Sequence, residues 1–318
     1  MRKEYGLAQL KVKRRGLLSG LHSVPEDPKV EMPRQKRVIY YLVAYVDILG
    51  QKKELAKLKE FPTTQEKESE FIKAISDSYG FVKAFRDSFN EFLHAVSPKT
   101  STESSSDIEK SLYKMKIAKV QTHVISDTVI LSAPLYDEDI KCPSSGIFQI
   151  LGSVASTFLL SLAFKKACRG GIEIGPSIEM GQGDIYGYAL LEAHRLESEV
   201  AEYPRIVIGN ELVQYLSLAK ESVSSNFYDT FNRAMSAICI DELISKDSDD
   251  QYVLDYLGEG FKKYIGSEEA TKENVLQAYE FVNKELYKFR KENKEAILVD
   301  KYSRLKEYFE KNIARWRE

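Results

Sequence analysis

Two aspartates stand out because each adjoins or interrupts a run of apolar residues. Asp47 follows the apolar run 37–46, and Asp127 lies inside the run 124–133. An aspartate at the exit of a buried strand, with a second in a hairpin turn of the same sheet, would bring two carboxylates onto one pair of divalent metal ions. Such metal pairs act on triphosphates. Singly, Asp47 could be a helix cap and Asp127 a turn residue, but together they favour metal ligation.

Composition limits the protein classes to which these carboxylates could belong. The chain has 318 residues, of which 43% are hydrophobic, so it can bury a full core. Its 46 basic and 48 acidic residues argue against a protein that binds nucleic acid over a broad basic face. We find no apolar stretch of about 18 residues and no signal peptide, so we expect neither a membrane span nor secretion.

The three cysteines favour a reducing compartment. They are far apart in the sequence and lack the Cys-x-x-Cys spacing of a zinc site. This usage fits a reducing environment, so a cytoplasmic protein without structural zinc is expected.

The order of the predicted elements indicates an α+β fold. A strand at 37–46, a long helical stretch, a hairpin with its turn near Ser126–Asp127 and later alternating helices and strands predict a mixed sheet covered by helices on one face. Within this order we expect a flexible leader (1–36), a main domain (37–260) with a helical insert (about 61–114), and a helical carboxyl-terminal extension (261–318). The Ser-rich segment 97–107 is predicted to be a surface loop.

Four motifs in this order resemble the class III nucleotide cyclase domain. They are Asp-Ile-Leu-Gly at 47–50, Ser-Asp at 126–127, Gly-Ile-Glu-Ile-Gly at 171–175 and Asp-Ile-Tyr-Gly at 184–187, the last of which opens a helix. The resemblance covers roughly residues 38–210. It implies a cyclase-like mixed sheet and an in-line attack of the ribose 3′-oxygen on the α-phosphorus, with diphosphate as the leaving group.

That chemistry assigns roles to the residues around the first aspartate. Asp47, Asp127 and the Ile48 carbonyl would hold two Mn²⁺ or Mg²⁺ ions. The backbone amides of Leu49, Gly50 and Gln51 would bind the β- and γ-phosphates, as the amides at a helix start often do.

By similarity to the same family, His123 and Asp184 would contact the base. Adenylate cyclases carry a lysine and guanylate cyclases a glutamate where this chain has His123, so neither purine is indicated. A histidine that donates and a carboxylate that accepts would suit the carbonyl and imide N–H of uracil, and cytosine remains an alternative. A histidine that only packs at the end of a strand is the structural alternative.

The family's next motif, Asn-x-x-x-Arg, is only half present. Its two positions fall on Leu191 and Arg195, so the asparagine that contacts ribose is missing. Arg195 could still stabilise charge on the α-phosphate, or it could be an ordinary surface arginine.

A narrower resemblance is to the pyrimidine cyclases of the Pycsar antiphage system, which also lack the asparagine. It covers Tyr-Val-Asp-Ile-Leu-Gly at 45–50, the helical insert, Arg-Gly-Gly-Ile at 169–172, residues 187–197 and 204–206, and the tail 301–309. It implies conversion of UTP to cyclic UMP, or of CTP to cyclic CMP, in a homodimer with composite sites. The product would act on a separate effector protein; no nucleic acid or membrane partner is expected. A degenerate cyclase that binds a nucleotide as a sensor is the alternative.

Overall fold

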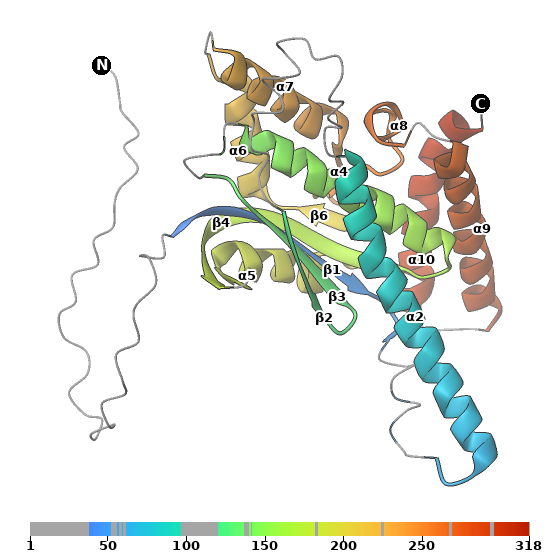
Figure 1. The fold of residues 1–318 in the computed structure, drawn as a ribbon. Helices are drawn as coiled ribbons and strands as arrows, with labels where there is room; N and C mark the ends of the chain where they lie inside the picture. The colour runs from blue at the N-terminus through green and yellow to red at the C-terminus, as the bar shows by residue number, and fades with distance from the viewer. Residues whose placement is uncertain are drawn as a thin grey trace, which may run out of the picture. The chain divides into compact units, whose positions relative to one another are not determined.

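The computed structural model describes residues 38–51, 56, 59, 62–96, 120–136, 140, 142–181, 184–223, 226–266, 269–292 and 296–317. These residues belong to one compact unit. They form the expected α+β arrangement, a mixed sheet with helices packed on it (Figure 1). The predicted leader 1–36 and the Ser-rich segment 97–107 lie outside the described residues.

In the described part of the chain, eight strands form one sheet in the order β2-β3-β1-β4-β6-β8-β7, with β5 paired to β4. Only the pairing of β4 with β6 is parallel. The strands are β1 (Ile39–Ile48), β2 (Gln121–Ile125), β3 (Thr128–Pro134), β4 (Cys168–Gly181), β5 (Asp184–Gly187), β6 (Ile206–Ile208), β7 (Ile244–Lys246) and β8 (Tyr252–Leu254).

The described helices are α2 (Gln65–Val96), α4 (Pro143–Ala163), α5 (Tyr188–Arg195), α6 (Asn210–Glu221), α7 (Phe227–Glu242), α8 (Glu259–Tyr264), α9 (Glu269–Lys291) and α10 (Ala296–Asn312). A π-helical turn at Leu196–Val200 continues α5, and a 3₁₀ turn at Ile313–Trp316 continues α10. The predicted insert therefore contains α2, and the predicted carboxyl-terminal extension contains α9 and α10.

Strand β1 lies inside the sheet, between β3 and β4, and it is covered on both faces. Leu42, Ala44, Val46 and Ile48 join the main core, whereas Tyr41 and Val43 join a second, smaller cluster on the other face. Because neighbouring side chains of a strand point to opposite faces, a strand covered on both sides needs apolar residues at successive positions. This burial confirms the buried strand predicted from the continuous apolar run.

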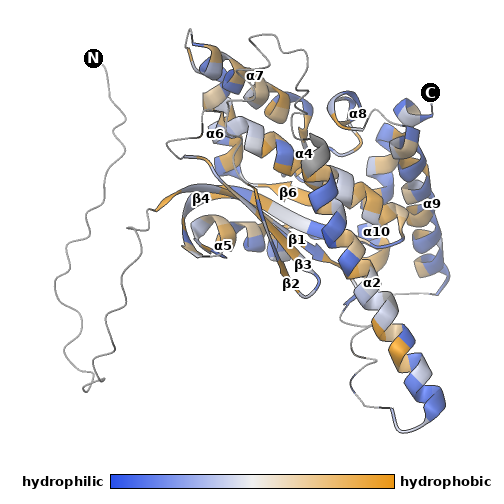
Figure 2. Cartoon of the chain, in the orientation of Figure 1, coloured by the Kyte–Doolittle hydropathy of each residue, from blue (hydrophilic) through white to orange (hydrophobic). Residues whose placement is uncertain are grey.

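Helix α4 lies across the main core face, where it contacts α2, α7 and α9. Its own residues are mostly apolar (Figure 2), and nearly all of them are buried. Our expectation that the chain lacks an apolar stretch of about 18 residues was wrong, since α4 is long and apolar enough to cross a membrane. However, 89% of its most apolar window is buried inside the molecule, which is typical of a core helix.

Helix α5 lies on the opposite face of the sheet, against β1 and β4 (Figure 1). The expectation that helices cover one face only was therefore wrong. Ala189 and Ala193 face the sheet, and the helix comes so close that a Cβ at Gly171 would collide with the Ala193 carbonyl oxygen. A Cβ at Gly175 would lie 2.7 Å from the Tyr188 ring. The glycines of the 171–175 motif thus permit close approach of α5.

The carboxyl-terminal helices are held to the sheet by a charged cluster around Tyr203. The guanidinium carbons of Arg205 and Arg304 lie 4.7 and 4.5 Å from the centre of the Tyr203 ring. Both arginines also donate to the Asp249 carboxylate, at 2.7 and 3.0 Å. Since Arg304 belongs to α10 and Arg205 precedes β6, this cluster fixes α10 beside the end of the sheet.

We predict that Gly171→Ala destabilises the protein by about 3 kcal/mol, because the new methyl group collides with backbone and cannot be relieved by a rotamer change. Gly80→Ala is the matched control. Gly80 lies in α2 with nothing within 4 Å of the added Cβ, so the same change should stabilise that helix by up to about 1 kcal/mol. Urea unfolding of both variants measures the difference, and equal stability of the two would contradict the packing of α5.

Candidate functional site

The structure brings Asp47 and Asp127 to the same end of the sheet. Asp47 is the second-last residue of β1 and pairs in register with Thr128 of β3. Asp127 precedes Thr128 in the two-residue turn between β2 and β3, at the predicted position of the turn. Its carbonyl oxygen accepts from the Ile48 amide at 3.3 Å. Ser126 has a φ of 58°, and positive φ values suit such short loops because their twist matches that of the strands.

Asp47 lies in surroundings that are poor in positive charge. Burial, together with the nearby charges of Asp127 and Glu197, raises the pKa of its carboxyl to about 6. The Thr128 hydroxyl, which donates to Asp47 Oδ1 at 2.8 Å, and the Arg169 guanidinium oppose this rise. A partly buried carboxylate with two acidic neighbours is an arrangement that a bound cation would stabilise.

The helix-cap alternative for Asp47 does not fit the structure. Asp47 is a paired residue of β1, in register with Thr128 and with Arg169, and its carboxylate accepts from a threonine hydroxyl. Asp127 is a turn residue, as the alternative for it stated. The turn also brings Asp127 next to β1.

An ion pair that the sequence did not suggest lies beside Asp47. Arg169 pairs in register with Asp47, and its Nε lies 2.5 Å from Oε1 of Glu197, whose side chain is only 4% exposed. From the sequence we assigned no role to Thr128, Arg169 or Glu197, although the last two lie in segments of the narrower resemblance. Thr128 could have been found because it directly follows Asp127, whereas the contact between Arg169 and Glu197 joins β4 to the turn after α5 and leaves no local pattern.

The predicted phosphate-binding amides are only partly available. The Leu49 amide donates to the Ala167 carbonyl at 2.8 Å, so it would have to leave this bond to contact a phosphate. The Gln51 side chain is buried and accepts from Ser78 Oγ at 3.0 Å. Gly50 has a φ of 89° and open space where a Cβ would stand, so its backbone can be approached by a ligand.

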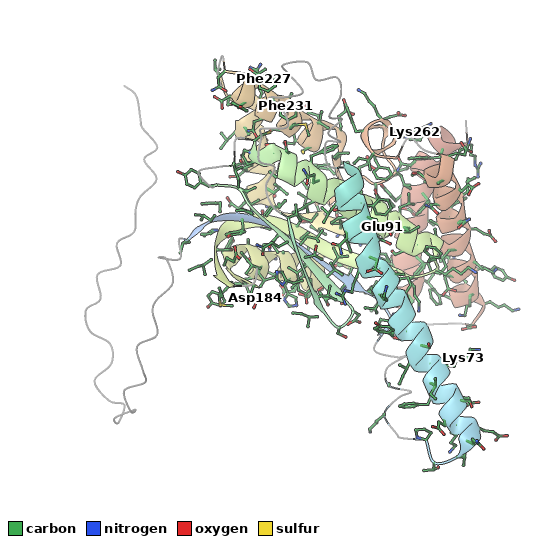
Figure 3. The ribbon with its side chains drawn as sticks, in the orientation of Figure 1. Lys73, Glu91, Asp184, Phe227, Phe231 and Lys262 are labelled. Carbon is green, nitrogen blue, oxygen red and sulfur yellow. The ribbon has the colours of Figure 1, made fainter. Side chains whose placement is uncertain are left out.

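His123 and Asp184, the two predicted base contacts, lie together. The distance from His123 Nδ1 to Asp184 Oδ1 is 3.5 Å, longer than a usual hydrogen bond. Asp184 is 67% exposed and lies on the side of the sheet that carries α5 (Figure 3). The other ring nitrogen of His123 is buried and has no hydrogen-bond partner among the described residues. A buried polar atom without a partner is what a site awaiting a ligand would contain.

Arg195 does not join the aspartates within one chain. Its Nε pairs with Oε2 of Glu192 at 2.8 Å, one turn earlier on α5, and its side chain is 45% exposed. Leu191, where the cyclase motif has asparagine, is also exposed. Both residues lie away from Ala189 and Ala193, which face the sheet, so any contact of Arg195 with a nucleotide at Asp47 would have to come from another chain.

The atoms available for a metal ion at this end of the sheet are oxygens. Within the described residues, no group of three or more His, Cys, Asp or Glu side chains is placed to hold a metal ion. The carboxylates of Asp47 and Asp127, with the Ile48 carbonyl, form a smaller set of the hard donors that Mg²⁺ and Mn²⁺ prefer. A set of two carboxylates and a carbonyl suits metal ions whose coordination is completed by phosphate oxygens and water.

No family model, curated protein or solved structure matches this chain. The resemblance to nucleotide cyclases therefore rests on the sequence motifs alone.

We predict that Glu197→Gln destabilises the protein by about 3 kcal/mol, because it leaves the Arg169 charge without its partner beside the sheet. Glu199→Gln, two residues away on an exposed position of the same turn, is the control and should change stability by less than about 0.5 kcal/mol. Thermal and urea unfolding measure both. A Glu197→Gln variant as stable as the control would show that the ion pair does not support this end of the sheet.

Proposed function

We propose that the protein is a class III nucleotide cyclase that converts UTP to 3′,5′-cyclic UMP and diphosphate. The observation that carries the proposal is the meeting of Asp47 and Asp127 at one end of the sheet, where burial and acidic neighbours raise the pKa of Asp47 to about 6. A pair of carboxylates placed in this way, whose charge the Arg169 guanidinium offsets only in part, suits a site that binds positively charged ions.

In the proposed reaction, the ribose 3′-oxygen forms a bond to the α-phosphorus while the bond from that phosphorus to the diphosphate breaks. The proton of the 3′-hydroxyl passes to solvent. Two Mn²⁺ or Mg²⁺ ions, when bound, would lower the pKa of this hydroxyl and neutralise the phosphate charge. Asp47, Asp127 and the Ile48 carbonyl would hold them, and the Gly50 and Gln51 amides would bind the terminal phosphates.

The base would be read by His123 and Asp184. Their side chains lie 3.5 Å apart, so one planar base edge could meet both. Asp184 would accept from the imide N–H of uracil, and a ring nitrogen of His123 would donate to a carbonyl. Cytosine offers an exocyclic amine to the same carboxylate, so cyclisation of CTP to cyclic CMP is the alternative within this function.

We further propose a homodimer in which Arg195 of one protomer reaches the aspartates of the other. In the single chain, Arg195 is exposed on the outward side of α5. Tyr186, Tyr188 and Leu191, on the same segment, are also exposed although they are large and mostly apolar. An apolar, uncovered segment next to the proposed base contacts favours pairing of two protomers there.

By its resemblance to the Pycsar pyrimidine cyclases, the protein would work in the cytoplasm and would make a second messenger in antiphage defence. A separate effector protein would bind the product. The second candidate is a nucleotide sensor without catalysis, and the observation that favours it is Leu191 in place of the asparagine that positions the ribose.

Incubation of the purified protein with Mn²⁺ and each of the four ribonucleoside triphosphates, with products identified by mass, tests the proposal. We expect cyclic UMP from the parent protein and at least a hundredfold less from Asp47→Asn and from Asp127→Asn, since each removes a proposed metal ligand, a loss of the order caused by deleting one transition-state contact. Asp87→Asn, an exposed surface aspartate of α2 that pairs with Lys83, is the control and should keep full activity.

Cyclic AMP or cyclic GMP as the product would contradict the role of His123. No cyclic product from any substrate, together with a thermal shift caused by UTP and Mn²⁺, would favour the sensor. Neither product nor thermal shift would exclude both functions.

A further inference from the structure

A large groove begins next to the proposed site and runs along the carboxyl-terminal helices. It has a volume of about 1070 Å³, and its lining includes Leu49 and Gly50, which follow Asp47 and Ile48 directly. The other walls are the turn after α4 and one side each of α9 and α10. The four class III motifs do not include these helices, and the narrower resemblance, which reaches 301–309 in α10, assigns no role to them, so neither explains this groove.

The lining is rich in lysine. Five lysines face three glutamates in the groove, although the whole chain has a net charge of −2. The lysines are Lys165 and Lys166 in the turn after α4, Lys284 and Lys288 on α9, and Lys301 on α10. Three separate segments therefore give one concave surface an excess of two positive charges (five lysines minus three glutamates), and such an excess attracts ligands of the opposite sign.

Most of this charge is not used within the protein. Lys288 lies 3.9 Å from Glu285, at the limit of an ion pair, and Lys166 lies over the Phe81 ring. Lys165, Lys284 and Lys301 form no ion pair with another residue of the described chain. Their ammonium groups are therefore free to bind an anion.

The turn after α4 holds one of these lysines in an unusual backbone conformation. Lys165 has a φ of 63°, in the left-handed region, just after the end of the helix. Glycine is the usual residue at such a position because a side chain is unfavourable there. A lysine in its place carries its charge into the groove.

We propose that this groove binds an oligophosphate, namely the terminal phosphates of the nucleotide and the diphosphate that the reaction releases. The identity of this ligand rests on the proposed function. The preference of the groove for a highly charged anion is inferred from the lysines, since several ammonium groups around one cavity suit an anion that carries three or four charges. Leu49 and Gly50 connect the groove to Asp47, so a phosphate chain that starts at the aspartates would extend toward α9 and α10.

Calorimetric titration of the full-length protein with inorganic triphosphate, without divalent metal and at low salt, tests the groove itself. In Lys284→Gln/Lys301→Gln we expect the dissociation constant to rise at least about tenfold, because two charge-assisted contacts are lost. Lys291→Gln/Lys306→Gln removes the same charge from the same two helices outside the groove and should change the constant less than twofold. No binding by the parent protein, or equal loss in both variants, would overturn the proposal.

Two further binding experiments distinguish failure of this proposal from failure of the proposed function. Asp47→Asn should bind inorganic triphosphate as the parent does, since this binding needs no metal, so loss of cyclase activity cannot imitate loss of the groove. Saturating UTP should abolish the binding of inorganic triphosphate, whereas uridine should not. Binding of both UTP and triphosphate at once would overturn the link between the groove and the nucleotide. Cyclase activity that persists without triphosphate binding would refute the groove alone.

Discussion

The central constraint of the structure is that β1 is buried on both faces and still ends in a carboxylate. Its apolar residues are needed by the core on one side and by α5 on the other. At the end of the strand, the register of the ladders puts Asp47 level with Thr128 and Arg169. The free energy required to bury that charge is reflected in the raised pKa of Asp47, and it is offset only in part by the threonine hydroxyl and the guanidinium. A cation bound at this end of the sheet would offset the remaining free energy of burying the Asp47 charge.

The two faces of the sheet differ in structure: one contains the main core, and the other contains most of the polar groups discussed above. The α4 face contains the main core and fixes β1, β3 and β4 relative to one another. On the other face, α5 packs close to the sheet because Gly171 and Gly175 have no side chains. This face contains Asp47, Glu197, His123 and Asp184. The carboxyl-terminal helices, held by the cluster around Tyr203, add a lysine-rich wall beside the same end of β1. A rigid core thus positions polar groups that come from widely separated parts of the chain.

Local patterns in the sequence predicted local features. The apolar run predicted β1, and Ser126–Asp127 marked the turn of the hairpin, because burial on both faces and turn chemistry leave short signatures. The pairing of Arg169 with Glu197, the bond from the Leu49 amide to Ala167 and the position of α5 on the second face were missed. Each depends on strand register or on contacts between distant segments, which no window of residues contains. The apolar stretch in α4 was not counted as long enough to cross a membrane, because serines and glycines interrupt its apolar residues.

The most direct test of the central claim is a titration of the protein with Mn²⁺, with the free ion followed by electron paramagnetic resonance in the presence of UTP. The account predicts that the parent protein and Asp87→Asn bind Mn²⁺, and that Asp47→Asn and Asp127→Asn both lose most of this binding. Equal Mn²⁺ binding by all four proteins, or a loss confined to one of the two aspartates, would contradict a shared metal site at the end of β1.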